Sequence, residues 1–502
     1  MLIRLFSGLV WLLAASMAQA GWLVAESEHF RIYSSMSETR LRKEAAVLED
    51  YHKLLERMTG RTVPANAPRL DIYLVENQKQ LSIVRPGIGP NIDGFYSATP
   101  GGIVALAAEP DLEGDWSGGR DTLLHEYAHH FMMQLGGGTV PAWYREGFAE
   151  YAMTASFRPD RIEYGGANPG RYWTLLNMPW EPLEKVLSGA RNMDMGKFYA
   201  QSWLLTHYLN RVEGMQAKRN AYLKKVAEGA DPVAAFKTEV DPDLDAFQSR
   251  MRAYINGRSA TLSRFKRTPP VPASVSVAAL PKAADANLLT LLSMQMPQEA
   301  EQDARSLARI REAAARSPDD PWAGRAAAIA EAIAGDEATA ARLLDALLAD
   351  NPDDADLLRW RASLYKADRP GASQADVAAA RKLLVRAWKA APDDWQVLWA
   401  YGSSYSSRGG ALSETVLDVM LKAADLAPQV QAVTMRTGIE MARAGHYDHA
   451  EALIAPSVNN PHFGGAMILE RNLLTALRSG DKQAVEAALM GLSFGQGSVS
   501  LD

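Results

Sequence analysis

The amino-terminal third of the chain alternates between strand-like and helix-like spacing of its apolar positions. Residues 28–34 alternate polar and apolar side chains, which predicts a strand. Residues 37–58 repeat apolar side chains at helical spacing, which predicts a long amphipathic helix. Residues 69–75, 94–98 and 103–107 have the pattern of further strands. Strands and helices in this order predict a small mixed sheet in an α+β domain.

Further along, helical periodicity dominates. Residues 120–134 and 141–151 have apolar positions at helical spacing, with three consecutive glycines between them that favour a tight turn. Residues 196–209 follow as a strong helix, and three shorter helices are expected up to residue 255. The stretch 158–182 is rich in Gly, Pro, Tyr and Trp, and we expect it to be irregular and to form part of a cleft wall.

The carboxy-terminal half is alanine-rich, helical and repetitive. Prolines recur between pairs of helical segments at spacings of 34, 40, 36 and 33 residues, at Pro318, Pro352, Pro392, Pro428 and Pro461. This period resembles that of tetratricopeptide repeats, in which each helix pair buries its face against the next. The resemblance implies an all-α solenoid that binds a protein partner, and a non-repetitive helical bundle is the alternative.

These patterns divide the chain into four parts. Residues 1–20 have the pattern of a signal peptide, and 21–258 form the α+β domain. The proline-rich segment within 259–282 is expected to be a linker, and 283–492 hold the helical repeats. A length of 502 residues is too great for a single core and agrees with more than one domain.

The amino-terminal segment predicts export. Arg4 precedes a mostly apolar stretch too short to span a bilayer comfortably, and Ala18 and Ala20 form a small-residue cleavage site, so we expect cleavage after Ala20. A short membrane anchor is the alternative. The protein would then be periplasmic or secreted, with no stable membrane span after cleavage. The chain has no cysteine, so disulfides cannot stabilise it.

Composition narrows the possible partners. The formal net charge is −6 and the isoelectric point is near 5.9, so the chain lacks the basic footprint of a nucleic-acid-binding protein. We therefore expect no nucleic acid among the partners, and the expectation of a peptide or protein substrate comes from a resemblance that is described below.

The segment 120–151 carries the candidate chemistry. It contains the pentad HEYAH, in which His125 and His129 are four residues apart and lie on one face of the predicted helix, where both can bind one small cation. Glu126 lies beside that cation without having to bind it. A catalytic zinc ion takes three protein ligands and leaves one position for water. Glu146, on the second helix, is expected to be the third ligand, and Glu150 to support a ligand histidine by hydrogen bonding.

The two sequences HEYAHH and WYREGFAEY resemble the gluzincin zinc metallopeptidases, in particular the EGxAEY wording of the peptidase MA-like superfamily. The resemblance covers roughly residues 22–258. It implies peptide-bond hydrolysis at a Zn²⁺ ion, with His125, His129 and Glu146 as ligands and Glu126 as general base. It also suggests that residues 102–106 are an edge strand that holds the substrate backbone. The glutamate-containing substrate strand of zinc aminopeptidases is missing upstream of His125, which favours an endopeptidase.

Two further residues are candidates for stabilising the oxyanion that forms during hydrolysis. Members of this class use a Tyr or His from a helix downstream of the glutamate ligand, and Tyr199 is the first candidate and His207 the second. Tyr199 as an ordinary buried aromatic is an equal alternative. His130 points away from the face shared by His125 and His129, so we expect it to pack or to support a ligand.

Three functions remain open from the sequence. The first is an exported zinc endopeptidase whose repeats recruit a protein partner. The second is a catalytically degenerate envelope scaffold or adaptor that acts through its repeats. The third is a different zinc hydrolase on the same scaffold, because the site chemistry alone does not choose the acyl substrate. The presence of Glu126 favours an active enzyme, since a decaying site usually loses its base early.

Overall fold

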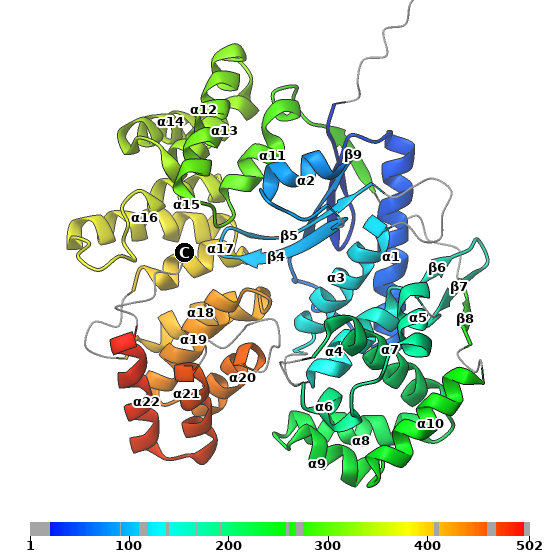
Figure 1. Ribbon diagram of the computed structural model, residues 1–502. Coiled ribbons are helices and arrows are strands. Elements are labelled where there is room, and N and C mark those ends of the chain that lie inside the picture. Colours follow the sequence, from blue (N-terminus) through cyan, green and yellow to red (C-terminus); the bar gives the residue numbers. More distant parts are fainter. Residues whose placement is uncertain are drawn as a thin grey trace, which may run out of the picture.

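The computed structural model describes residues 21–90, 92–109, 118–136, 140–166, 168–189, 193–257, 261–267, 275–405, 411–458 and 468–495. Over these residues the protein is mostly helical, with a mixed sheet near its centre and a long succession of helices in its carboxy-terminal half (Figure 1). The predicted signal peptide and Pro461 lie outside the described residues. None of the described helices is both long and apolar enough to cross a membrane.

The central sheet has six strands. The β2–β3 and β3–β5 pairs are parallel and the other pairs are antiparallel. Phe30 and Ile32 alternate inward along β2, as the period of the sequence predicts. The strands are ordered β4 (Gly94–Thr99), β5 (Gly102–Ala108), β3 (Leu70–Val75), β2 (Phe30–Ser34), β1 (Leu23–Glu26) and β9 (Ser276–Ala279). A second sheet holds β6 (Ser156–Phe157), β7 (Arg161–Tyr164) and β8 (Ser263–Lys266).

Two expectations from the sequence are corrected by this topology. The expected substrate strand, residues 102–106, falls in β5, which is paired on both sides, so β4 is the edge strand of the sheet. The expected linker, residues 259–282, contains β8 and β9, which pair with β7 and β1. Two strands of the expected linker, β8 and β9, therefore belong to the sheets of the amino-terminal domain.

Ten helices surround the sheets in the described part of the amino-terminal half. The stretch 158–182, expected to be irregular, holds β7 and a helix, α5, which begins where the Asn168 side chain accepts hydrogen bonds from the backbone N–H groups of Gly170 and Arg171. The helices are α1 (Glu38–Thr59), α2 (Gln78–Val84), α3 (Gly118–Gln134), α4 (Ala142–Ala152), α5 (Pro169–Asn177), α6 (Leu183–Ser188), α7 (Met195–Arg211), α8 (Met215–Ala227), α9 (Pro232–Glu239) and α10 (Leu244–Asn256).

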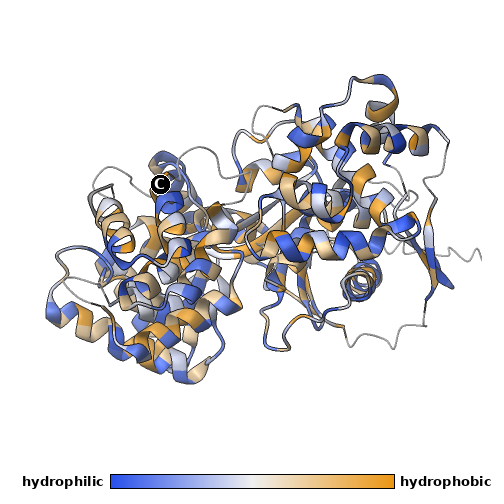
Figure 2. Ribbon diagram, turned by 90° about the horizontal axis from the view of Figure 1, so that it is seen from below, coloured by the Kyte–Doolittle hydropathy of each residue, from blue (hydrophilic) through white to orange (hydrophobic). Residues whose placement is uncertain are grey.

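The carboxy-terminal half is a succession of helices, and individual helices carry both apolar and polar residues (Figure 2). The recurring Pro-Asp-Asp sequences lie between helix pairs. In each of them the second aspartate, Asp320, Asp354 or Asp394, caps the next helix by accepting hydrogen bonds from its backbone N–H groups. The helices are α11 (Ala284–Met294), α12 (Ala300–Arg316), α13 (Pro321–Ala334), α14 (Glu337–Asp350), α15 (Ala355–Ser363), α16 (Gln374–Ala390), α17 (Trp395–Ser403), α18 (Glu414–Leu426), α19 (Gln431–Ala444), α20 (Tyr447–Val458), α21 (Ile468–Ser479) and α22 (Lys482–Gly495).

The two halves share one hydrophobic core. Leu398 of α17, Val419 of α18 and Val433 of α19 belong to the same buried cluster as the sheet, α1 and α3. The Gln396 side chain donates a 2.9 Å hydrogen bond to the carbonyl of Pro100, in the turn between β4 and β5. Helices α17 to α19 thus lie beside the β4 edge of the sheet, where Figure 1 shows them.

Candidate metal centre

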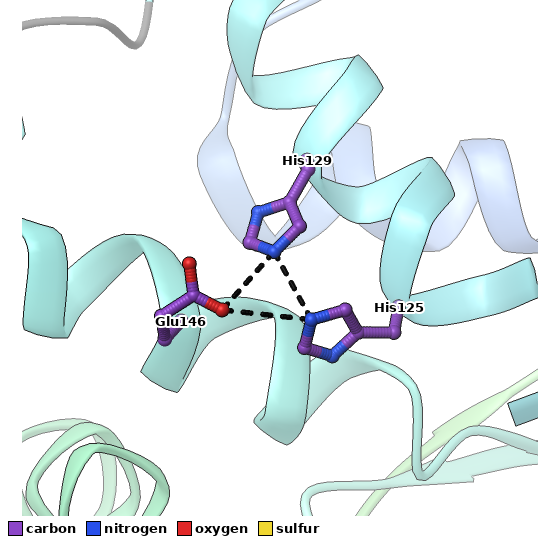
Figure 3. A group of neighbouring side chains, drawn as sticks. All are labelled: His125, His129 and Glu146. Carbon is purple, nitrogen blue, oxygen red and sulfur yellow. Dashed lines mark hydrogen bonds and ion pairs between the residues drawn. The ribbon is translucent and has the colours of Figure 1, made fainter. Parts of the chain in front are cut away.

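Helices α3 and α4 bring three potential ligands together. His125 and His129 project from α3, one turn apart, toward Glu146 on α4 (Figure 3). The first helix ends at Gly136, whose φ of 74° is a left-handed conformation that glycine adopts without strain. The expected glycine turn continues through residues 137–139, which lie outside the described residues.

The three ligand atoms face one another across short distances. The Nε2 atoms of His125 and His129 are 3.0 Å apart, and Glu146 Oε2 lies 3.3 Å from His129 Nε2 and 3.6 Å from His125 Nε2. Ligand atoms around a tetrahedral zinc ion with bonds of about 2.0–2.1 Å are separated by roughly 3.3 Å. The spacing of this donor set therefore fits a small divalent cation held by two imidazoles and one carboxylate.

Glu146 is buried because α4 packs closely against α7. Gly147, the next residue, permits this contact: a Cβ atom there would lie 2.3 Å from the Ser202 carbonyl oxygen and from Thr206 Oγ1, both on α7. The Glu146 side chain is 1% exposed, so its charge is held out of water. A buried carboxylate needs a cationic partner, and the two histidines alone provide one only when protonated.

The charges of the nearby carboxylates affect the pKa of His125. Burial acts to lower the pKa of His125, but the hydrogen bond that the imidazole donates to Glu146 and the charges of Glu150, Glu146 and Glu126 outweigh it and raise the pKa to about 9. The environment of the imidazole therefore favours a positive charge, which a bound cation would provide in place of the proton.

Glu150 lies near His125, at a distance longer than the hydrogen bond that the sequence predicts, so its supporting role stays a prediction. Its Oε1 lies 3.7 Å from His125 Nδ1, on the opposite side of the ring from the ligand nitrogen. Arg171 of α5 holds this carboxylate with two hydrogen bonds of 2.9 and 2.8 Å. The contact between Arg171 and Glu150 was not predicted from the sequence. The stretch around Arg171 is rich in glycine and proline, so its pattern does not indicate that a helix forms there and brings Arg171 to Glu150.

Tyr199 lies beside the candidate metal ligands and His207 does not. The ring of Tyr199 is 6.2 Å from that of His125, and the Arg171 guanidinium lies 4.9 Å above it. Burial, together with the charges of Glu146 and Glu150, raises the pKa of Tyr199, so its hydroxyl stays protonated at neutral pH and can donate a hydrogen bond. His207 is fully buried, within hydrogen-bonding distance of the Tyr254 hydroxyl (3.0 Å) and the Thr261 carbonyl (3.2 Å), and does not line the cleft.

His130 has a packing role at the side of the centre. Its Nδ1 lies 3.0 Å from the Tyr96 hydroxyl of β4 and 3.3 Å from the Gln429 amide nitrogen. Burial, with the nearby His52, lowers the pKa of His130 to about 3, so the ring is neutral. His130 therefore links α3 to the edge strand and to the segment between α18 and α19.

A cleft opens over the three ligands, with about 1190 Å³ of empty space, part of it open to solvent. Glu126 and Tyr199 line it, as does the β4 edge strand from Tyr96 to Thr99. The far wall comes from the carboxy-terminal helices, whose contributing residues are Pro428, Gln429, Gln431, Pro456 and Ser457. The contact of the repeats with this cleft could not be predicted from the sequence, because periodicity predicts helix pairs and not the surface on which they pack.

Comparison with known proteins adds little to this geometry. No protein-family model matches the chain, and no curated protein matches it. A solved structure titled "MamA RS-1 ArsTM double mutant" aligns with 31% of this chain and 84% of that chain, at 21% sequence identity and a TM-score of 0.25. The interpretation of the site therefore depends on its own residues and their arrangement.

Proposed function

We propose that this protein is an exported zinc metallopeptidase of the gluzincin type, which hydrolyses peptide bonds as an endopeptidase. The observation that carries the proposal is the convergence of two imidazole nitrogens and one buried carboxylate within a cleft that also contains Glu126. When bound at His125, His129 and Glu146, zinc would lower the pKa of a water molecule and polarise the carbonyl of the scissile bond.

The remaining steps are performed by residues of the chain. Glu126 would accept the proton of the attacking water and deliver it to the leaving nitrogen. The Tyr199 hydroxyl would donate a hydrogen bond to the oxygen that becomes negative as the carbonyl is attacked. Glu150, held by Arg171, would fix the orientation of the His125 ring.

The carboxy-terminal helices support a tetratricopeptide-like arrangement in which consecutive pairs stack, with aspartate caps at regular intervals. In this proposal they serve two purposes. Their outer surface would bind a protein partner, and residues such as Gln429 and Ser457 would contact the substrate directly, because they line the cleft. This second role favours an enzyme over a scaffold that acts through its repeats alone.

The proposal is tested by combining metal analysis with one substitution. Purified protein is expected to hold about one zinc ion per chain, and Glu126→Gln is expected to keep the metal while losing peptide hydrolysis, because the amide cannot accept the proton. Zinc content by atomic spectroscopy and turnover of a quenched-peptide library are the measurements. Full activity of Glu126→Gln would exclude the assigned mechanism, and metal-free protein would exclude the proposed enzyme.

A further inference from the structure

Arg145 is a buried cation that makes no hydrogen bond and no ion pair with the residues that the structure describes, although the charge of the adjacent Glu146 acts on it. Its side chain comes directly before the ligand Glu146 in α4, lines the cleft, and belongs to a residue that is 5% exposed. The Nε and Nη2 atoms are fully covered and make no hydrogen bond, and none of the ion pairs between described residues includes Arg145. The guanidinium therefore lies out of water with unused donors.

Such an arrangement is unfavourable unless an anion completes it. A buried ion without a partner is destabilising by several kcal/mol, and a guanidinium cannot avoid this by losing its proton. Other arginines near the centre have such partners: Arg171 is paired with Glu150 at 2.8 Å, and Arg120 with Glu44 at 2.7 Å. Arg145 differs from them in that it has no ion pair with a carboxylate of the described residues and is one of the residues that line the cleft.

The described residues around the cleft do not complete the pairing of Arg145, because Glu146 acts on it through its charge without forming an ion pair. Glu126 and Glu146 are the two carboxylates in the described lining, and both already have roles at the metal centre. Among the described residues, the wall formed by the repeats is uncharged, with Gln429, Gln431 and Ser457 as its polar members. Within this described lining, a negative group that enters the cleft would meet one arginine, Arg145, besides the candidate metal ligands, and no carboxylate on the opposite wall.

We propose that Arg145 is the anchor of a substrate carboxylate, which makes this a peptidase selective for a negative charge close to the bond it cuts. The planar guanidinium offers parallel N–H donors that match the two oxygens of a carboxylate. The carboxylate is either the carboxy terminus of the peptide or an Asp or Glu side chain. This inference rests on the proposed function, since it names the substrate of the same cleft.

The test measures peptide binding to zinc-loaded Glu126→Gln, in which the probe is not cut. The probes are acetylated, fluorescently labelled hexapeptides of Ala and Gly in three forms: amidated, with a free carboxy terminus, and amidated with one Asp scanned through each position. We expect at least one carboxylate form to bind about 10- to 100-fold more tightly than the uncharged amide, as for a charge-assisted bidentate pair. Comparison of the two charged forms identifies the source of the carboxylate.

The same probes are then applied to variants in the Glu126→Gln background. Arg145→Gln is expected to abolish the preference and Arg145→Lys to retain part of it, with zinc content unchanged in both. Arg120→Gln is the matched control, because Arg120 has its own partner outside the cleft lining, and it is expected to keep the full preference.

Several outcomes would overturn the inference. These are equal binding of charged and uncharged probes, failure of every probe to bind at millimolar concentration, or a preference that survives Arg145→Gln. A loss of zinc in Arg145→Gln and Arg145→Lys without a change in preference would also overturn it, since that would make Arg145 a structural support of Glu146. Absence of zinc from the parent protein contradicts the proposed function instead, which separates the two failures.

Discussion

Two groups of histidine and glutamate side chains in this protein have similar composition and different geometry. His125, His129 and Glu146 lie in the cleft, and Glu28, His29 and Glu49 lie where β2 begins beside α1. Each group places three possible ligand atoms within 4.8 Å of one another. Proximity alone therefore does not distinguish a metal centre from an ordinary cluster of polar residues.

The two groups differ in the hydrogen bonds that their buried carboxylates, Glu49 and Glu146, accept. Glu49 accepts hydrogen bonds from both nitrogens that His29 offers, its backbone N–H at 2.9 Å and its ring Nδ1 at 2.8 Å. In the cleft, by contrast, two imidazole Nε2 atoms face each other at 3.0 Å with Glu146 beside them. The first group is completed by its own donors, and the second has three ligand atoms directed at one point.

The largest expected effect comes from removing one carboxylate from each group. Glu146→Ala is expected to weaken zinc binding by more than the roughly 100-fold that loss of an outer partner causes, because it removes a direct ligand. Glu49→Ala is expected to leave zinc binding unchanged. Competition titration with a fluorescent chelator measures both. Equal zinc affinities of the two variants would contradict the assignment of the zinc ligands to the group of His125, His129 and Glu146.

The second prediction concerns acid stability and applies to Glu49. Burial opposes ionisation, but the hydrogen bonds from His29 and Ser27 prevail and lower the pKa of Glu49 from 4.5 to about 2. A lowered folded-state pKa stabilises the protein above pH 4.5, and this stabilisation is lost as the pH falls through about 2. The depression corresponds to at most about 3 kcal/mol at pH 7.

Urea denaturation of the wild type and of Glu49→Gln at several pH values measures this contribution. The two free energies of unfolding are expected to differ most at neutral pH and to converge as the pH approaches 2. Glu28→Gln is the control, because Glu28 is exposed and belongs to the same group. A difference that is independent of pH would contradict the role assigned to the ionised Glu49.

The smallest expected effect is on the support of the metal centre. Glu150→Gln is expected to weaken zinc binding by about 10- to 100-fold, because the amide interacts less strongly with His125 and with Arg171 than the carboxylate does. Isothermal titration of metal-free protein measures the affinity. Glu163→Gln, which disturbs an ion pair with Arg161 away from the cleft, is the control and is expected to bind zinc normally.

Much of the geometry of the candidate metal centre could be predicted from the sequence because it is local. Helical spacing fixes His125 relative to His129, and the short segment between the two helices limits where the second helix can place Glu146. The Glu150 position follows from the same periodicity. These contacts require only that two helices form and pack, which the pattern of apolar residues already indicates.

The contacts missed by the sequence analysis join segments far apart in the chain. Arg171 reaches Glu150 only because α5 forms and turns toward α4. The far wall of the cleft depends on helices around Gln429, some 300 residues after His130. The order of the strands, with β4 and not β5 at the edge, depends on hydrogen bonding that no local period reveals. Tertiary packing decides each of these features.

The pairing of β1 with β9 has a consequence for how the molecule is made. It places Leu23 opposite Ala279, so the first strand gains its second neighbour only when the middle of the chain has emerged from the ribosome. Long-range pairing of this kind slows folding, since a large loop has to close first. The far wall of the cleft is complete only after Ser457 has been synthesised and its helix has packed. The segment that contains His125, His129 and Glu146 is therefore synthesised long before the residues that form the far wall of the cleft.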